Sequence, residues 1–401
     1  MKSQSLLLYI LALTQFLTIT FAAKRDHKQC FDFPDPLNPT RFDTPDCPTV
    51  ENDETYHVEV ERGIQNFFQV DLNCYYTAAV CKKIRNAFND AGKEISKVLK
   101  LKEKIYVNAT YESFSYSEKT LLGSAYPARS LSLISDDKIT RLYPQALAKQ
   151  FSLKKHPEYS KYDINARFNA DFSWWFKADN KKIKPYQYDF FVVILHELIH
   201  GLGFISSWDT YLETNTYQTI TGLTSNYYFY ENNEFGGFIE NIFDRYLKVI
   251  ENKKKIPLSY YTAQLNKSVP PMTLFYTRLE FTNKVKSSPQ WKYAKSVLKA
   301  ATSNNILFTP AKRTSWKQDI YLEASLKPFV SGSSICHVSQ SKYRKTSDFV
   351  MTYQQFPGET EKYLIERGGN YKSPIGPRII SVLESIGYAT AANPNPIKPK
   401  Y

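Results

Sequence analysis

The residues best suited to chemistry lie in one short stretch, residues 189–204, which contains the pattern H-E-x-x-H. If this stretch is helical, the four-residue spacing places His196 and His200 on one face about one turn apart, where two ring nitrogens can bind one metal ion. Glu197 follows the first histidine, so its carboxylate can reach a metal-bound water and accept a proton from it. The pattern therefore predicts a Zn²⁺ cofactor and a hydrolytic reaction.

The residues around this motif predict a buried helix that ends at a glycine turn. Apolar and aromatic residues fill positions 190–195, and Gly201 and Gly203 come directly after the motif. A buried helix with three ionisable groups needs a partner for them, and a divalent cation is such a partner. We expect Gly203 to let the chain turn back toward the metal.

A catalytic zinc ion usually has three protein ligands and one water, so a third ligand is required. The compact continuation H-x-x-G-x-x-H fails because Ser206 stands where its last histidine would be, and Asp209 is three residues out of register. Glu240 is one alternative, since Asp244 follows it four residues later as in the ligand helix of thermolysin-like enzymes. In that gluzincin arrangement Glu240 would be the third ligand.

The histidine inventory favours a different third ligand. Of the six histidines in the chain, only His337 comes after the predicted zinc helix. It also precedes Met351 by a short loop. We therefore predict His337 as the third ligand, while the neighbouring thiol of Cys336 is a further candidate.

These segments resemble the metzincin clan of zinc endopeptidases, and most closely its leishmanolysin-type members and their secreted relatives. The likeness is specific in four segments, residues 196–204, 333–337, 349–353 and 376–388. It implies a two-lobed α/β (α+β) fold with zinc in the cleft between the lobes. It also implies a long insertion, residues 206–335, between the zinc helix and the third ligand.

The resemblance assigns two further site residues. Met351 would form the methionine turn, an apolar floor beneath the three zinc-bound imidazoles. Tyr353, two residues later, would correspond to the tyrosine that in some metzincins swings toward the zinc or the oxyanion. Three departures from the clan's pattern bear mainly on the third ligand: Cys336, the size of the insertion, and the absence of the compact spacing to a third histidine.

The elements that must position these residues follow from hydrophobic periodicity. Apolar residues recur at helical spacing over residues 77–101, and β-branched and aromatic residues alternate with polar ones over residues 105–114. A helix that leads into a strand favours an α/β class. Further predicted elements are a short helix at 143–151, a strand at 163–176, and helices at 238–247, 289–301 and 376–388.

The domain organisation is predicted from composition. Residues 1–22 read as a secretory signal peptide, with Lys2 before an apolar run. Residues 23–75, rich in Pro, Asp and Asn, read as a loop-rich leader or propeptide. The metallopeptidase domain is expected over 76–390, and the tail 391–401, with three prolines, is expected to be disordered.

Cysteine usage agrees with an exported protein. The five cysteines are an odd number, and closeness in sequence favours the pairs Cys30–Cys47 and Cys74–Cys81, which leaves Cys336 free. Asn108 and Asn266 stand in glycosylation sequons. The mature protein is therefore expected to be secreted, extracellular and glycosylated.

The formal net charge of +13 is distributed over many short Lys and Arg clusters. Such clusters usually form solvated surface, although they also attract acidic cell-surface polymers. No interleaved array of basic and aromatic residues indicates nucleic-acid binding. After the signal peptide, no run is long and apolar enough to span a bilayer.

Together these patterns predict a secreted zinc endopeptidase that acts on protein or peptide substrates. Two alternatives remain open: a gluzincin-type peptidase that uses Glu240, and a secreted binding protein with a structural zinc ion, such as an adhesin. Glu197 favours an enzyme, because a structural metal site does not need a general base.

Overall fold

The computed structural model describes residues 29–51, 66–213, 219–369 and 372–401. The predicted signal peptide, residues 1–22, lies outside these described residues. The described chain is a mixed α/β protein, in which several small sheets and helices share one large hydrophobic core. The α/β class predicted from the sequence is confirmed at this level.

A four-stranded sheet carries the element that the motif occupies. Its order is β3-β4-β9-β5, with β3, β4 and β9 parallel and β5 antiparallel to β9. The strands are β3 (Phe68–Cys74), β4 (Ile105–Glu112), β5 (Gly123–Pro127) and β9 (Ile164–Asn169). β5 is therefore an edge strand of this sheet.

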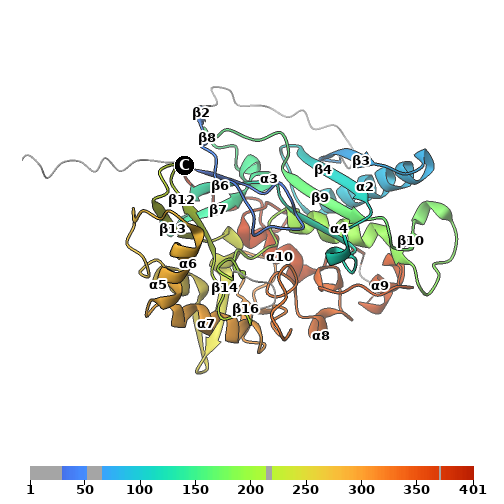
Figure 1. Ribbon diagram of the computed structural model, residues 1–401. Helices are drawn as coiled ribbons and strands as arrows, with labels where there is room; N and C mark the ends of the chain where they lie inside the picture. Colours follow the sequence, from blue (N-terminus) through green and yellow to red (C-terminus); the bar gives the residue numbers. More distant parts are fainter. Residues whose placement is uncertain (1–28, 52–65, 214–218, 370–371) are drawn as a thin grey trace, which may run out of the picture.

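Two helices pack together against this sheet (Figure 1), α2 (Ala78–Val98) and α4 (Phe190–Gly201). Every residue of α4 is buried, as expected from its apolar sequence. Asp189 caps the helix by accepting a hydrogen bond from the backbone N–H of Phe191 at 3.1 Å. Gly201 lies against the side chain of Ile164, so this end of the helix approaches β9 more closely than a side chain would allow.

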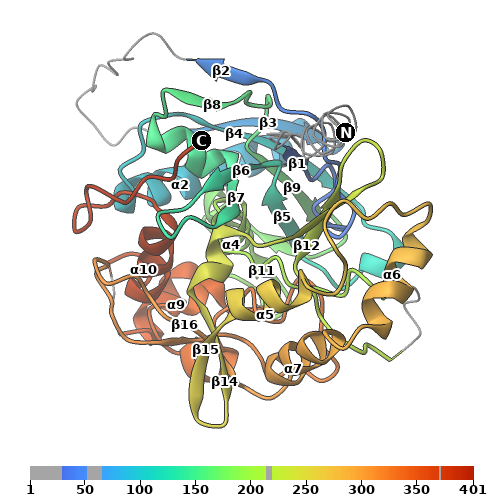
Figure 2. The same cartoon turned by 90° about the vertical axis from the view of Figure 1, so that its left-hand side faces the viewer.

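The long segment after α4 folds into its own sheet and helices, which Figure 2 shows on the opposite side of the molecule from β3 and β4. One sheet has the order β15-β14-β16-β17, and β12 pairs with β13. The elements are β12 (Asn226–Phe229), β13 (Phe235–Ile239), β14 (Leu247–Glu251), β15 (Lys254–Pro257), α5 (Leu258–Leu265), α6 (Arg278–Ser287), α7 (Trp291–Ala301), β16 (Ile306–Phe308) and β17 (Ile320–Tyr321).

Smaller elements complete the described chain. Three strands form the sheet β1-β6-β7, and two further pairs are β2-β8 and β10-β11. Their bounds are β1 (Cys30–Asp32), β2 (Thr49–Glu51), β6 (Arg129–Ile134), β7 (Thr140–Pro144), β8 (Lys155–Pro157), β10 (Trp174–Trp175) and β11 (Tyr188–Asp189). The remaining α-helices are α3 (Gln145–Ala148), α8 (Gln340–Tyr343), α9 (Glu361–Arg367) and α10 (Pro377–Ile386). The 3₁₀ helices are η1 (Tyr116–Glu118), η2 (Lys149–Phe151), η3 (Lys177–Asp179), η4 (Ile242–Tyr246) and η5 (Phe349–Met351).

Three of the predicted segments need correction. The loop-rich leader predicted over residues 23–75 is wrong at its C-terminal end, because β3 lies inside this range and pairs with β4 in the central sheet. The tail was predicted to be disordered, but Lys400 and Ile134 exchange two backbone hydrogen bonds of 2.7 and 2.8 Å. The helix predicted at 238–247 is only the 3₁₀ helix η4, since β13 takes up its first residues.

The predicted disulfides Cys30–Cys47 and Cys74–Cys81 are confirmed, and Cys336 is free and buried. Both sequon asparagines make side-chain hydrogen bonds within the fold. Asn266 donates to and accepts from the backbone of Phe238 at 3.0 and 2.7 Å, and Asn108 donates to Asn165 at 3.1 Å.

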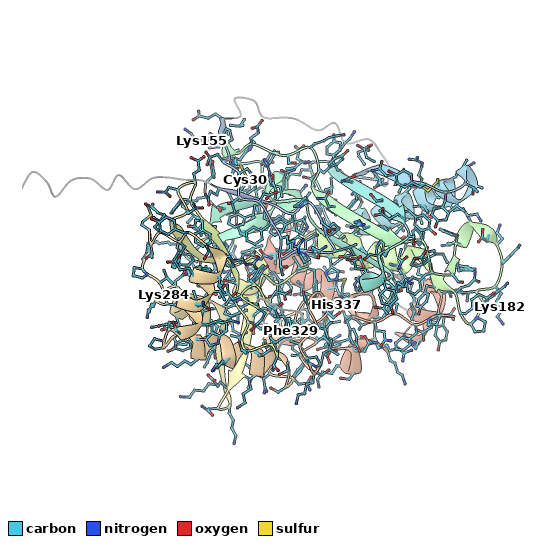
Figure 3. The ribbon with its side chains drawn as sticks, viewed as in Figure 1. Cys30, Lys155, Lys182, Lys284, Phe329 and His337 are labelled. Carbon is cyan, nitrogen blue, oxygen red and sulfur yellow. A yellow bond between two sulfur atoms is a disulfide. The ribbon has the colours of Figure 1, made fainter. Side chains whose placement is uncertain are left out.

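Several of the lysines lie at the surface, whereas Arg141 is buried. Figure 3 shows Lys155, Lys182 and Lys284 at the periphery, and all three are exposed, whereas His337 lies in the interior. None of the helices in the described parts of the chain has the length and apolar character that a membrane span requires.

The turn after α4 generates a testable prediction. Gly203 has φ +109°, and a Cβ there would lie 2.8 Å from Cγ of Pro144. Gly203→Ala is expected to lower the free energy of unfolding by about 1–3 kcal/mol, because it combines backbone strain with a clash in the core. Urea denaturation followed by tryptophan fluorescence measures this loss.

Gly369→Ala is the matched control. Gly369 has nearly the same φ, +106°, and no atom within 4 Å of the added Cβ. It therefore reports the backbone strain without the clash. Equal losses for the two variants would show that the contact with Pro144 does not constrain the turn.

Candidate metal centre

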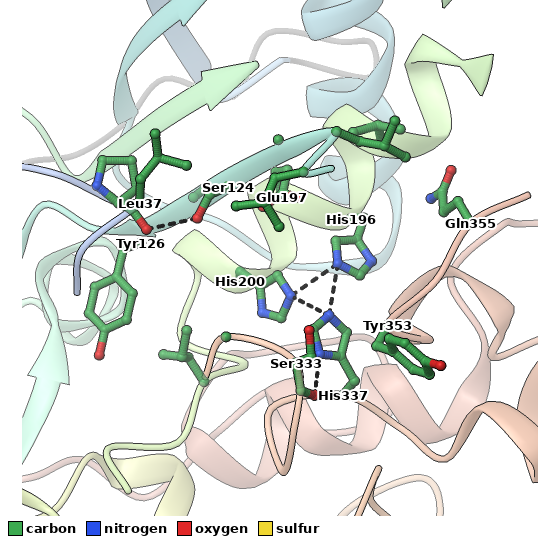
Figure 4. Close-up of a pocket in the computed structure, with 18 of the residues that line it drawn as sticks. Leu37, Ser124, Tyr126, His196, Glu197, His200, Ser333, His337, Tyr353 and Gln355 are labelled. Atoms are coloured by element: carbon green, nitrogen blue, oxygen red, sulfur yellow. Dashed lines mark hydrogen bonds between the residues drawn. The ribbon is translucent and has the colours of Figure 1, made fainter. Parts of the chain in front are cut away.

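The three imidazoles predicted as metal ligands meet at one point. His196 and His200 extend from α4, and His337 comes from a loop after β17 (Figure 4). The Nε2 atoms are 3.1 Å apart for His196 and His200, and 3.0 Å apart for each of the pairs with His337. Of all the residues that the structure describes, only this group of His, Cys, Asp or Glu has the arrangement of a metal site.

The other ring nitrogen of each histidine contacts a backbone carbonyl. Nδ1 of His196 donates to the carbonyl of Val350 at 2.5 Å, Nδ1 of His200 to Phe204 at 2.8 Å, and Nδ1 of His337 to Ser333 at 2.9 Å. A carbonyl oxygen can only accept, so each Nδ1 must carry the proton. In a neutral imidazole the Nε2 atom is then an unprotonated acceptor.

Three unprotonated acceptors therefore face one another in a buried space. None of the three rings can donate to another without becoming charged, and their burial disfavours that charge. Burial lowers the pKa of His196 to about 4, and burial together with the His196 ring lowers the pKa of His200 to about 3. Burial and both neighbouring rings hold the pKa of His337 well below its usual value. The three Nε2 atoms could therefore hold a metal ion between them.

A short ladder of backbone bonds fixes His337. The N–H of Glu323 donates to the carbonyl of His337 at 2.8 Å, and the N–H of Val338 donates to the carbonyl of Met351 at 2.9 Å. His337 thus lies next to the segment that follows β17 on one side and next to the turn containing Met351 on the other. Met351 is fully buried, as expected for an apolar floor.

The turn that holds His196 is itself anchored by a buried carboxylate. Asp348 accepts from the backbone N–H of Arg378 at 2.8 Å and pairs with its guanidinium at 2.7 Å. The guanidinium stacks on the ring of Trp316, 4.1 Å from its centroid. The N-terminus of α10 is thereby joined to η5, whose Val350 carbonyl orients His196.

Glu197 points its carboxylate toward the edge of the central sheet. It is 6% exposed, and it accepts a hydrogen bond from the backbone of Ala125 in β5. Burial raises the pKa of Glu197 to about 8, while a cation bound nearby would favour its charged form. The side chain lines the same cavity, of about 270 Å³, as the three histidines.

Glu240 does not belong to the centre. Its carboxylate accepts from Ser259 at 2.7 Å and from Thr262 at 2.6 Å, and it pairs with Arg141 at 3.3 Å. The gluzincin alternative is therefore wrong, because this buried network already satisfies the carboxylate and the three histidines converge without it.

Asp244, the residue four positions after Glu240, has a different role. It accepts from Ser206 at 2.6 Å and from the N–H of Ser207 at 2.9 Å, so it fixes the chain directly after the glycine turn. Burial and the nearby Glu240 raise the pKa of Asp244 to about 7. Asp209, which is out of register for a third ligand, accepts a hydrogen bond from the hydroxyl of Ser331 at the rim of the cavity.

Two other expected site residues are near the centre. Tyr353 lines the cavity, and Figure 4 shows its ring beside His337 with the hydroxyl directed away from the imidazoles. The thiol of Cys336 donates to the carbonyl of Gly332 at 3.0 Å, and burial strongly raises the pKa of this thiol. The thiol is therefore occupied by a backbone contact and lies outside the ligand triangle.

The sequence did not reveal two contributors to the cavity. One is the edge of β5, residues 123–126, and the other is the N-terminal segment that contributes Pro36, Leu37 and Pro39. Both reach the site through long-range contacts, which leave no local pattern in the sequence. The sequence indicated only Ser333, which is four residues before His337. At this spacing its backbone carbonyl can accept a hydrogen bond from the His337 ring.

Comparison with known proteins places these observations in a family context. A family model described as SPBPB7E8-like matches residues 30–401. An uncharacterized protein of Schizosaccharomyces pombe, PB7E8.01, is 26% identical over 376 residues, which cover 82% of this chain and 64% of the relative. The chain thus spans less than two thirds of that relative's length. No solved structure matches the chain.

The metal centre can be tested by its stoichiometry. His337→Ala is expected to lose the bound ion after dialysis and to weaken metal affinity more than 100-fold, since removing a ligand should exceed the roughly 10–100-fold cost of losing an outer hydrogen bond. Elemental analysis of the purified protein measures metal per chain.

Glu240→Gln is the paired variant, because it changes the rival carboxylate at constant size. It is expected to keep one ion per chain. The assignment fails if Glu240→Gln loses the ion while His337→Ala retains it.

Proposed function

The chain belongs to the SPBPB7E8-like family, and we propose that it is a zinc-dependent endopeptidase of the metzincin type. The observation that carries this proposal is the convergence of three unprotonated Nε2 atoms beside the buried carboxylate of Glu197. Three neutral imidazoles with a base next to them are typical of a catalytic zinc site, whereas a structural site is closed by four protein ligands.

The donor set fits zinc. Tetrahedral zinc with Zn–N distances of about 2.1 Å separates its ligand nitrogens by roughly 3.4 Å. The nitrogens here are 3.0–3.1 Å apart, so they need to move by only a few tenths of an ångström. When bound, zinc would activate a water near neutral pH and polarise the scissile carbonyl.

The protein's own residues supply the proton transfers and the position of the substrate. The Glu197 carboxylate takes the proton from the attacking water and passes it to the nitrogen of the leaving amine. The backbone N–H of Ala125 holds that carboxylate toward the β5 edge. Burial excludes competing water from the histidine cluster.

The edge of β5 supports a peptide as the substrate. β5 pairs with β9 along one side only, and its other side faces the cavity at Ala125. An extended peptide can add to such an edge through main-chain hydrogen bonds, which do not depend on its sequence. At Ala125 the backbone carbonyl would take part, because the N–H of Ala125 holds Glu197. A scissile carbonyl would thereby be carried past Glu197 and the three histidines.

The same proposal includes a two-lobed catalytic domain and an extracellular location. The upper lobe would contain the β3-β4-β9-β5 sheet with α2 and α4, and the lower lobe the elements that follow Gly203. Two disulfides support an exported, extracellular protein.

Tyr353 would stabilise the oxyanion after a side-chain rotation toward the metal. Acidic cell-surface polymers are proposed partners of the basic surface.

Replacement of the base tests the reaction. Glu197→Gln is expected to retain zinc and to lower kcat/KM on casein peptides by about 10²–10⁴-fold, since a positioned general base contributes that much. Hydrolysis is followed by mass spectrometry of the products. A variant with full zinc content and undiminished hydrolysis would refute the proposed role, and wild type that binds zinc without cleaving any peptide would favour a binding protein instead.

Removal of the metal is an independent test. We expect a zinc chelator to abolish hydrolysis and to lower the Tm, because the ion's binding energy contributes to folding. Added zinc should restore both. A chelated protein with unchanged Tm would show that the three histidines hold no ion in solution.

A further inference from the structure

The N-terminal disulfide closes a hairpin whose tip reaches the metal cavity. The backbones of Asp32 and Asp43 exchange two hydrogen bonds of 2.9 Å, and Cys30 is bonded to Cys47 behind them. Residues 33–42, here called the tip loop, therefore project beyond the paired region. Among them, Pro36, Leu37 and Pro39 line the same cavity as His196, Glu197, His200 and His337.

The tip loop is fixed in place by contacts on several sides. Asp35 accepts from the N–H of Leu37 at 3.1 Å and from Asn38 at 2.7 Å, and it pairs with Arg167 at 3.0 Å. Phe33 is fully buried, and its ring lies 4.6 Å from that of Tyr126. The loop is thus a rigid part of the cavity wall.

Its path follows the strand that is proposed to bind substrate. The N–H of Phe33 donates to the carbonyl of Ala128 at 2.9 Å, just beyond the end of β5, and Ser124 within β5 donates to the carbonyl of Pro36 at 2.8 Å. The prolines of the tip loop have no N–H to donate, so the loop cannot pair with β5 as a regular strand of the sheet. The tip loop thus runs beside β5 from Ala128 to Ser124, next to the space that an extended peptide on this strand would occupy.

The loop lies on one side of the metal centre. Figure 4 shows Leu37 and Tyr126 on one side of the three imidazoles, and Tyr353 and Gln355 on the other. Leu37 is half-buried, and the nearby lining residues Tyr126 and Ile205 are also apolar and mostly covered. A partly exposed leucine at the end of a groove forms an apolar surface for a ligand side chain.

We infer that the tip loop is a wall of the substrate cleft, and that Leu37 selects an apolar substrate side chain on that side of the scissile bond. This inference rests on the proposed endopeptidase function. The N-terminal segment is accordingly part of the specificity apparatus rather than a detachable leader.

A charge placed at this position provides the sharpest test. The full chain and its Leu37→Arg and Leu37→Ala variants are incubated with a peptide library, and cleavage sites are read by mass spectrometry. Leu37→Arg is expected to raise the preference for Asp or Glu over aliphatic residues at one substrate position by about tenfold or more. Leu37→Ala is expected to admit larger side chains at that same position.

Leu279→Arg is the matched control, because Leu279 is 59% exposed and lies in α6, outside the cavity lining. It adds the same charge and should leave the cleavage profile unchanged. Zinc per chain is measured for every variant, which separates a change in selectivity from loss of the metal centre. If Leu37→Arg fails to fold, Leu37→Ala carries the comparison.

The outcomes distinguish the two proposals. Zinc-loaded, active Leu37 variants with the wild-type profile would overturn the role of the tip loop and leave the endopeptidase standing. Wild type that holds zinc but cleaves no peptide would overturn the proposed function, and the inference with it. A change confined to one substrate position, absent from Leu279→Arg, is the result that supports both.

Discussion

The structure depends on the orientation of three imidazole rings by three backbone carbonyls. Each carbonyl accepts the Nδ1 proton of one histidine, and so determines that its Nε2 atom is bare. The carbonyls belong to Phe204, Ser333 and Val350, which lie in three different turns of the chain. The three Nε2 atoms face one another only because each of these turns places its carbonyl against one ring.

The surrounding contacts serve to hold those turns. The glycine turn after α4 is fixed by Asp244 through Ser206 and Ser207, and η5 is fixed by Asp348 through Arg378. These carboxylates are fully buried and each accepts several hydrogen bonds, which offsets the cost of removing them from water. These two buried carboxylates therefore hold the turns whose backbone carbonyls contact the histidine rings.

The cavity is assembled from parts that are distant in sequence. One wall is the edge of β5 and another is the tip loop, while His337 arrives after a segment that forms its own sheet and helices. A buried cluster of hydrophobic side chains runs from Phe68 in β3 to Tyr388 after α10. The long segment between α4 and His337 consequently shares the core of the central sheet, which explains how a histidine remote in sequence is held beside α4.

The sequence by itself determined the local features: the H-E-x-x-H helix, its glycine turn, α2, β4, α10 and the two disulfides. These depend on periodicity, capping, glycine conformation and short separations, which act over a few residues. Only the tertiary structure decided between His337 and Glu240. Both are polar residues far from α4 in the sequence, and the side chains that surround each of them depend on tertiary packing. It also decided that residues 68–74 are a sheet strand and that Leu37 faces the cavity, since strand pairing and loop docking depend on contacts between distant residues that no local pattern records.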